Sequence, residues 1–289
     1  MIFKNIAVIP NEKKDPFFKH TKNLIEYFAD YSADKDINIF LCDVYKQKIN
    51  NCVLKYISEE DLYKSCDLIV ALGGDGTILK ISAKASRSGK PVIGINLGKI
   101  GFLSEIELHE FTLFDNLLSG EYKIDNRMML DVEIIKDTGV IYAGSALNDA
   151  DIKNGAMARL IDIDLICDDV KITQYRADGV IITTPTGSTA YSLSAGGPII
   201  DPNIECLCVT PICAHSLINR PMIFSHDSVL EVRNKQASAE AYLTIDGQIN
   251  FKLDESDIVR IKKSQFTAKL VRVKNHGFFD VIRKKILEK

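Results

Sequence analysis

The sequence lacks the features of a membrane protein and of a nucleic-acid-binding protein. Lys and Arg number 36 against 39 Asp and Glu, for a formal net charge of −3, whereas binding to nucleic acid needs a basic patch that displaces counterions. No window of about 18 apolar residues is present. The first residues also lack a basic segment followed by an apolar run, as in a signal peptide. We therefore expect a cytoplasmic protein that binds neither nucleic acid nor a membrane.

The seven cysteines form no Cys-x-x-Cys pair and are odd in number, which disfavours a zinc site or a redox couple. Cys206 and Cys208 alternate within an apolar run and would point to the same side of a strand. We interpret the cysteines as small buried residues in a reducing compartment.

In the first half of the chain, short apolar runs alternate with helical patterns. Asp15 and Pro16 suit a helix start, and Phe17, Leu24 and Phe28 follow at helical spacing. Continuous apolar strands separated by helices predict a parallel sheet that is covered on both faces. The expected strands are 6–9, 37–42, 68–72 and 92–95, and 77–86 is an expected helix.

The second half, after about Gly120, is predicted to be mainly β. Residues 160–165 show near alternation of apolar residues with Asp162 and Asp164, as in a half-solvated antiparallel sheet. Expected strands are 129–135, 140–147, 160–167, 180–184, 229–232, 241–245, 258–261 and 270–273, followed by a helix at 278–287.

With 289 residues, of which 46% are hydrophobic, the chain has the length of roughly two globular domains. We predict an α/β domain with a Rossmann-like parallel sheet at 1–120 and a β-rich domain at 121–265. A C-terminal segment, 266–289, is expected to carry a closing helix and to pack back on the α/β domain.

The apolar run 68–72 leads directly into Gly73-Gly74-Asp75-Gly76-Thr77. A glycine turn between a strand and a helix presents backbone amides to a phosphate. It lacks the Gly-Lys-Ser/Thr ending of a P-loop and the spacing of a dinucleotide-binding Gly-x-Gly-x-x-Gly. A carboxylate among the glycines would repel phosphate unless it accepted a proton or held Mg²⁺. Alternatively, Asp75 is an ordinary turn residue, although ligands commonly bind at this end of parallel strands.

A second segment, 183–192, is dense in hydroxyl groups that could bind a polyol or a nucleotide, with a short helix expected near Ser188. Its alternative is a Ser/Thr-rich surface connection. Two further pairs, Asn148-Asp149 and Asp246-Gly247, have a plain interpretation as turns. Lys80, one turn into the expected helix, could reach the phosphates or could simply be solvated. The hydroxyls belong to Thr183, Thr184, Thr186, Ser188, Thr189, Tyr191 and Ser192.

In this order, the motifs resemble the NAD kinase family from about residue 5 to the C-terminal helix. The Gly-Gly-Asp-Gly-Thr turn alone also occurs in diacylglycerol and sphingosine kinases, with a similar turn in phosphofructokinases. The stretch 184–191 is much more particular to NAD kinases. Further matching segments are Asn96-Leu97-Gly98, Gly101-Phe102-Leu103, Asn148-Asp149, Gly196-Gly197-Pro198, Arg220-Pro221 and Asp246-Gly247-Gln248.

The resemblance implies a kinase that phosphorylates the 2′-hydroxyl of the adenosine ribose of NAD, with Asp75 as the general base. A divalent cation such as Mg²⁺ would arrive mainly on ATP, and no protein side chain is assigned to metal. The family also implies a homodimer or homotetramer. Phosphate-binding positions would be Gly73, Gly74, Gly76 and Thr77. NAD-binding positions would be Asp75, Gly76, Lys80, Asn148, Asp149, Arg159, Arg176, Asp178, Thr189, Ala190, Tyr191, Ser192, Ser194 and Gln248.

Two other functions compete with this interpretation. A lipid kinase would share the glycine turn but should show a basic amphipathic surface helix, of which the only hint is Arg283-Lys284-Lys285. A dinucleotide sensor without catalysis would keep the hydroxyl-rich segment and could dispense with Asp75. Arg159 and Arg176 could instead pair with carboxylates such as Asp162 or Asp178. The motifs suit ATP or polyphosphate as donor, and NAD or NADH as acceptor.

Overall fold

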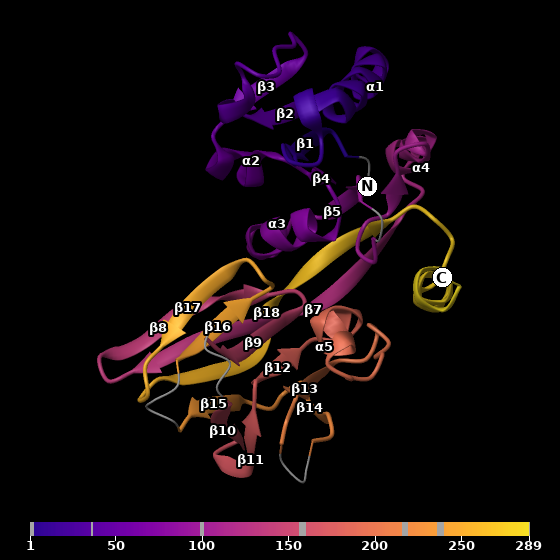
Figure 1. Ribbon diagram of the computed structural model, residues 1–289. Helices are drawn as coiled ribbons and strands as arrows, with labels where there is room; N and C mark the ends of the chain where they lie inside the picture. Colours follow the sequence, from indigo (N-terminus) through magenta and orange to yellow (C-terminus); the bar gives the residue numbers. More distant parts are fainter. Residues whose placement is uncertain are drawn as a thin grey trace. The chain divides into compact units, whose positions relative to one another are not determined.

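The chain divides into two compact units (Figure 1). The computed structural model describes residues 3–35, 37–98, 101–155, 160–215, 219–235 and 240–288. Unit 1 comprises Met1–Asn126 together with Ala268–Lys289, and unit 2 comprises Arg127–Thr267. The chain passes from one unit to the other within strands β7 (Lys123–Lys136) and β18 (Ile258–Arg272). In the described part of the chain, no helix is long and apolar enough to span a membrane.

Unit 1 is built on a parallel sheet with the strand order β5-β4-β1-β2-β3, which confirms the predicted α/β fold. The end of β18 joins β5 in parallel at Leu270, opposite Val92, and a short strand, β6, also pairs with β5. The strands are β1 (Asn5–Pro10), β2 (Asn38–Cys42), β3 (Leu54–Ile57), β4 (Leu68–Leu72), β5 (Val92–Asn96) and β6 (Ile106–Glu107).

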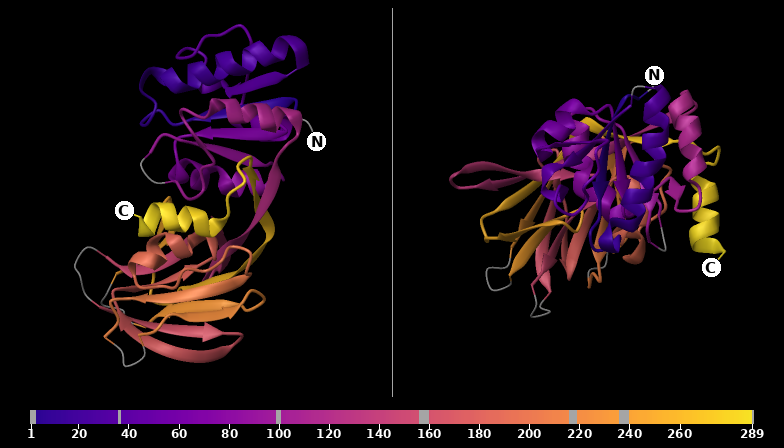
Figure 2. Two further views of the ribbon diagram at one scale, coloured as in Figure 1. Left: turned by 90° about the vertical axis from the view of Figure 1, so that its right-hand side faces the viewer. Right: turned by 90° about the horizontal axis from the view of Figure 1, so that it is seen from above.

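Helices cover both faces of this sheet (Figure 2). On one face, Phe28 of α1 and Phe114 of α4 meet edge to face with ring centroids 5.0 Å apart. On the other, Ile78 of α3 packs so closely on β5 that a Cβ on Gly94 would overlap it. The helices are α1 (Lys19–Lys35), α2 (Glu59–Ser65), α3 (Asp75–Arg87), α4 (Phe114–Ser119) and α6 (Phe278–Ile282), with single turns η1 (Pro16–Phe18), η2 (Asp43–Tyr45), η3 (Phe111–Leu113) and the π-helical η5 (Arg283–Leu287).

The start of α1 differs from the expected Asp-Pro helix start. Phe17 and Phe18 adopt positive φ angles of 58° and 55°, so the regular helix begins only at Lys19. The buried Asp15 carboxylate accepts hydrogen bonds from the amides of His20 and Thr21 at 2.9 and 2.8 Å. Phe17 is 91% exposed and is not part of the apolar stripe. Asp15 still satisfies amides at the helix start, but from farther back along the chain.

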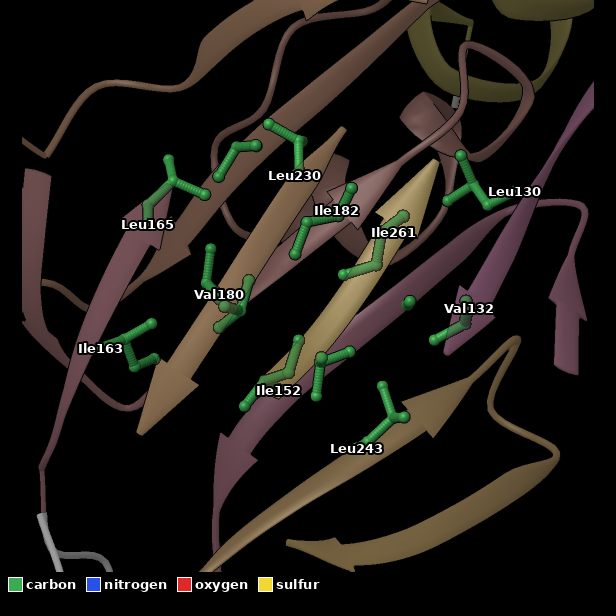
Figure 3. Close-up of a cluster of buried hydrophobic side chains, with 14 of the residues drawn as sticks. Leu130, Val132, Ile152, Ile163, Leu165, Val180, Ile182, Leu230, Leu243 and Ile261 are labelled. Atoms are coloured by element: carbon green, nitrogen blue, oxygen red, sulfur yellow. The ribbon is translucent and has the colours of Figure 1, made fainter. Parts of the chain in front are cut away.

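Unit 2 is almost entirely β, as predicted, and its core lies between packed sheets (Figure 3). One antiparallel sheet has the order β14-β13-β12-β9-β16-β17. The strands β11-β10-β15-β18 and the β7-β8 hairpin face the same apolar core, which includes Leu130, Ile163, Ile182, Leu243 and Ile261. The strands are β8 (Gly139–Ala146), β9 (Asp149–Asn154), β10 (Ile161–Cys167), β11 (Val170–Ala177), β12 (Gly179–Thr183), β13 (Cys206–Ile212), β14 (Met222–Ser225), β15 (Leu230–Asn234), β16 (Ala241–Ile245) and β17 (Ile249–Leu253), with the helical turns η4 (Thr186–Thr189) and α5 (Tyr191–Ser194).

The sequence analysis divided one long strand into two. The expected strands 258–261 and 270–273 are the two ends of the 15-residue strand β18. Its middle, Lys262-Lys263-Ser264-Gln265, is polar and therefore has no apolar pattern. Lys262 and Lys263 nevertheless form ion pairs with Glu133 and Glu205 of the same unit.

We predict that Phe114→Ala lowers the free energy of unfolding by about 3–5 kcal/mol, since it removes a fully buried ring and leaves a cavity. The side chain is 0% exposed, whereas that of Phe279 is 63% exposed. Phe279→Ala is therefore the matched control and should change stability by less than about 1 kcal/mol. Denaturant unfolding measures both values, and equal losses would contradict the assigned packing.

Candidate active site

In unit 1, the candidate site begins where β4 ends. Gly73 and Gly74 separate the buried strand from α3, whose first residue is Asp75. A Cβ on Gly73 would come within 3.0 Å of Thr77. Gly74 has φ 130° and ψ −171°, a conformation open essentially to glycine alone. Both positions therefore require glycine, and the turn directs the first amides of α3 toward the carboxyl end of the sheet.

The Asp75 carboxylate is held by three consecutive backbone amides. Phe102 N–H donates to Oδ2 at 2.8 Å, and Leu103 and Ser104 N–H donate to Oδ1 at 3.0 and 3.3 Å. These amides belong to the segment that follows β5, the neighbour of β4 in the sheet. The geometry thus provides a firmly positioned oxygen acceptor at the start of α3.

A lysine that the sequence analysis did not select lies beside this turn. Lys14 is in the loop after β1, and its Nζ lies 3.2 Å from where a Cβ on Gly74 would be and 3.3 Å from that on Gly98. Asn11 anchors the loop by donating to Thr77 Oγ1 at 2.9 Å. Among the described residues, the Lys14 ammonium group has no carboxylate partner. The sequence signal for it is position alone: it follows β1, which is adjacent to β4 in the sheet.

Lys80 lies farther along α3 and is exposed. The structure therefore brings Lys14 to the glycine turn, while Lys80 has only its position on the helix to support a phosphate contact. Thr77 is buried, and its hydroxyl accepts the hydrogen bond from Asn11. A Cβ on Gly76, by contrast, would meet nothing within 4 Å.

In unit 2, the backbone around Asn148 is fixed from two sides. The Asp246 carboxylate accepts hydrogen bonds from Leu147, Asn148 and Asp149 N–H at 2.8, 2.8 and 3.1 Å. Thr183 Oγ1 and Thr184 N–H both donate to the Asn148 carbonyl, at 2.9 and 2.8 Å. No described residue forms a hydrogen bond with the Asn148 side-chain amide. That amide group is consequently available to a ligand.

Several hydroxyls of the segment 183–192 serve the protein itself. Thr184 donates to Leu147 O at 2.6 Å, Ser188 to Pro185 O at 2.6 Å, and Ser192 pairs with Thr210 at 2.9 Å. All three side chains are 0% exposed. These three hydroxyls are therefore committed to hydrogen bonds within the protein. Density of hydroxyls also occurs where a loop must satisfy its own buried backbone groups.

Gly187 shows how tightly this loop is packed. A Cβ there would come within 3.0 Å of both the Asn148 carbonyl oxygen and Thr183 Oγ1. The loop thus presses on the same peptide group that Thr183 and Thr184 hold. The short helix expected near Ser188 is present as the turn η4 followed by α5.

Tyr191, the exposed residue of the segment, lines a pocket of about 370 Å³ in unit 2. The other lining residues are Ser194, Ala195, residues 211–214 and Asn219. Lys153 Nζ lies 5.7 Å from the centre of the Tyr191 ring and 3.0 Å from Asp151 Oδ1. The pocket therefore combines an aromatic face with a nearby charged pair, which suits a planar polar ligand.

The other predicted site residues lie at different places in unit 2 or outside the described residues. Asp178 accepts a hydrogen bond from Asn154 at 3.2 Å, and Arg176 is exposed on β11. Gln248 is exposed at the β16–β17 turn, where Asp246 and Gly247 have the positive φ angles expected of such a hairpin. Thr189 and Ala190 are partly buried. Arg159 lies outside the described residues.

Two carboxyl groups near Asn148 have perturbed acidities. Burial raises the pKa of Asp149 to about 7, and the charges of Asp246 and Asp151 add to that rise. Burial also raises the pKa of Asp246 to about 6, although its three amide donors oppose the shift. The amide donors favour the charged form of Asp246, so we assign the first proton to Asp149. Within the part of the chain that the structure describes, no cluster of three or more His, Cys, Asp or Glu could hold a metal ion.

Comparison with known proteins identifies the class. The family model described as the ATP-NAD kinase N-terminal domain matches residues 41–122, and that described as the ATP-NAD kinase C-terminal domain matches residues 147–273. The first match contains the glycine turn and Asp75, and the second contains Asn148 and the segment 183–192. The two matches thus define a kinase of the ATP-dependent NAD kinase class.

The sequence is similar to those of known proteins along nearly the whole chain. An NAD kinase of Thermoanaerobacter sp. strain X514 is 40% identical over 292 aligned positions, covering 99% of this chain and 100% of that protein. An NAD kinase of Solibacter usitatus is 43% identical over 78% of this chain and 79% of its own length. The chain belongs to the NAD kinase family, which confirms the resemblance seen in the sequence.

Solved structures show the same fold. Yeast NADH kinase in complex with NADH superposes with a TM-score of 0.89 at 27% identity, covering 100% of this chain and 88% of that one. An NAD kinase from Archaeoglobus fulgidus in complex with ATP has a TM-score of 0.74 at 26% identity and covers 99% of each chain.

We predict that Asp149→Asn reduces the loss of stability between pH 5.5 and pH 8. An unfolded Asp titrates near pH 4, whereas the folded pKa is about 7, so the folded chain binds more protons between these values. Stability is then fully present below about pH 4 and falls as pH rises through about 7. The thermal midpoint of the variant should gain a few degrees over the parent at pH 8, as about 1 kcal/mol corresponds to roughly 2–4 °C. Asp137→Asn, in the exposed β7–β8 turn, is the control; an identical pH dependence of Asp149→Asn and parent would contradict the prediction.

Proposed function

We propose that this chain transfers the γ-phosphoryl group of ATP to the 2′-hydroxyl of the adenosine ribose of NAD, giving NADP and ADP. The observation that carries the proposal is the Asp75 carboxylate, held by three amides at the start of α3. The membership of the chain in the NAD kinase family and its likeness to structures with bound NADH and ATP support it. The membership of the chain in the NAD kinase family excludes the lipid-kinase alternative.

In this reaction, Asp75 acts as the general base. The ribose oxygen forms a bond to the γ-phosphorus as the bond from that phosphorus to the bridging oxygen of ADP breaks, and the hydroxyl proton passes to the carboxylate. The remaining demand is for positioning and charge neutralisation. Amides of Gly74, Asp75 and Gly76 at the start of α3 would contact the phosphates, with Mg²⁺ arriving as part of the ATP substrate.

For the acceptor, unit 2 offers an amide group and a pocket. The side chain of Asn148 can donate and accept hydrogen bonds, as recognition of ribose hydroxyls or an adenine edge requires, and it lies beside Asp149, whose pKa is raised to about 7. Tyr191 supplies an aromatic face at the pocket. The remaining positions that family resemblance assigns to NAD are Lys80, Arg159, Arg176, Asp178, Thr189, Ala190, Ser192, Ser194 and Gln248. We further propose that the enzyme works in the cytoplasm as a homodimer or homotetramer.

We predict that Asp75→Asn lowers kcat by about 10²–10⁴-fold, the range that a positioned proton acceptor contributes. The amide keeps one oxygen to accept a hydrogen bond, so the fold should persist. The measurement is NADP formation from NAD and Mg-ATP, followed with an NADP-specific dehydrogenase, with thermal unfolding as the check on folding. Near-parental turnover of the variant would refute Asp75 as the base. Tight NAD binding by a parent that makes no NADP would instead indicate a sensor.

We predict that Lys14→Met raises KM for ATP roughly tenfold, equivalent to about 1.4 kcal/mol, through loss of one charge-assisted contact to phosphate. KM for NAD should change little. Lys13→Met, which removes a neighbouring exposed ammonium group of the same loop, is the control and should leave both constants unchanged. Equal increases in KM for ATP and NAD, or no increase at all, would remove Lys14 from the phosphate site.

A further inference from the structure

The C-terminal helical segment places one cation against the segment that holds Asp75. Lys285 Nζ donates a hydrogen bond to the carbonyl of Gly101 and lies 5.9 Å from the centre of the Phe102 ring. A Cβ on Gly101 would lie 3.3 Å from this Nζ and 3.0 Å from Asn96 Nδ2. Gly101 thus lies between the side chains of Asn96 and Lys285.

Lys285 differs from the other basic residues of its segment. Arg283 and Lys284 are exposed, and Arg283 pairs with Asp280 and Glu288. Lys285 is half-buried, and burial lowers its pKa, whereas the charges of Asp75 and Glu107 raise it. Withdrawing an ammonium group from water is costly unless polar groups replace the lost hydration. The Gly101 carbonyl, the Phe102 ring and the Asp75 charge provide that replacement.

The arrangement places a positive charge near Asp75 without a direct ion pair. In the described part of the chain, no carboxylate lies within ion-pairing distance of Lys285 Nζ. A cation at this distance attracts the negative charge of Asp75 without bonding to the carboxylate oxygens. The other charged groups around Asp75 and Lys285 are Lys14 beside Gly74, Glu107 on β6, and Lys274 and Lys284 of the C-terminal segment.

We propose that Lys285 is a positioning residue for the phosphoryl transfer: its ammonium group fixes segment 101–104, whose amides hold the Asp75 carboxylate, and its charge attracts that of the carboxylate. The inference rests on the proposed function. Lys285 itself contacts no reacting atom. It acts through Gly101 and Phe102, and it makes catalysis by the glycine turn depend on the C-terminal segment.

Three substitutions separate the two effects. Lys285→Met removes both the donor and the charge, Lys285→Gln keeps an N–H donor without the charge, and Lys285→Arg keeps both. Lys284→Met removes an exposed charge of the same segment and is the matched control. Circular dichroism and thermal unfolding report whether each variant is folded, and the Gln and Arg variants remain informative if the Met variant is not.

The experiment is the pH profile of kcat and of kcat/KM for NAD, at saturating Mg-ATP, from pH 5.5 to 9. We expect the acid limb of Lys285→Met and Lys285→Gln to move upward by roughly half to one pH unit, as loss of one nearby cation requires. Lys285→Met should also lose about tenfold in kcat above the limb, and Lys285→Gln less, while KM for NAD changes little in both. Lys285→Arg and Lys284→Met should retain the parental limb.

A uniform loss of activity with an unshifted acid limb in both uncharged variants would overturn the electrostatic part and leave only a structural role. Parental kinetics in Lys285→Met would overturn the whole inference. A parent that forms no NADP would refute the proposed function instead. The two failures are therefore distinguishable, because the first appears only on comparing variants and the second appears in the parent.

Discussion

The site depends on one recurring interaction, a carboxylate that accepts hydrogen bonds from consecutive backbone amides. Asp75 binds residues 102–104 in unit 1, and Asp246 binds residues 147–149 in unit 2. In both cases the bonded residues are distant in sequence: Asp75 joins the glycine turn to the segment after β5, and Asp246 reinforces the pairing of β16 with β9. Charge-assisted bonds of this kind are about twice as strong as neutral ones, and several together restrict a loop to one conformation.

The same device has different consequences at the two places. Asp246 is buried, and its oxygens are committed to the backbone, so its role is to orient Asn148 and Asp149. Asp75 is only partly buried and lies at the first residue of a helix, where the helix dipole stabilises negative charge. A carboxylate that is partly accessible and rigidly held is suited to accept a proton from a substrate. Burial and helix position, more than residue type, thus distinguish a structural aspartate from a proposed catalytic one.

Much of the fold was predictable because its signals are local. Apolar runs identified β1, β2, β4 and β5, and the loss of helical periodicity after Gly120 identified the β-rich half. Local patterns failed where tertiary contacts decide the structure. The polar middle of β18 is stabilised by ion pairs with Glu133 and Glu205, and Phe17 leaves the helical stripe because the backbone turns there. For the site, the glycine turn was recognisable in the sequence, because its glycines directly follow an apolar strand. Lys14 and Lys285 were not recognisable. Lys14 comes to that turn through the order of the strands in the sheet, and Lys285 through the return of the C-terminal segment to unit 1.

Unit 1 is discontinuous in sequence, and this has a consequence for synthesis on the ribosome. Residues 268–289 complete a unit whose other part ends at Asn126, so unit 2 is translated in full before the last strand segment and helix of unit 1 exist. During that interval, β5 has no β18 beside it, and segment 101–104 has no Lys285 to hold it. The nascent chain would therefore carry a finished β-rich unit next to an incomplete one. Assembly of the proposed base therefore awaits synthesis of residues 268–289, and a chain that lacks them would contain all of unit 2 but an incomplete unit 1.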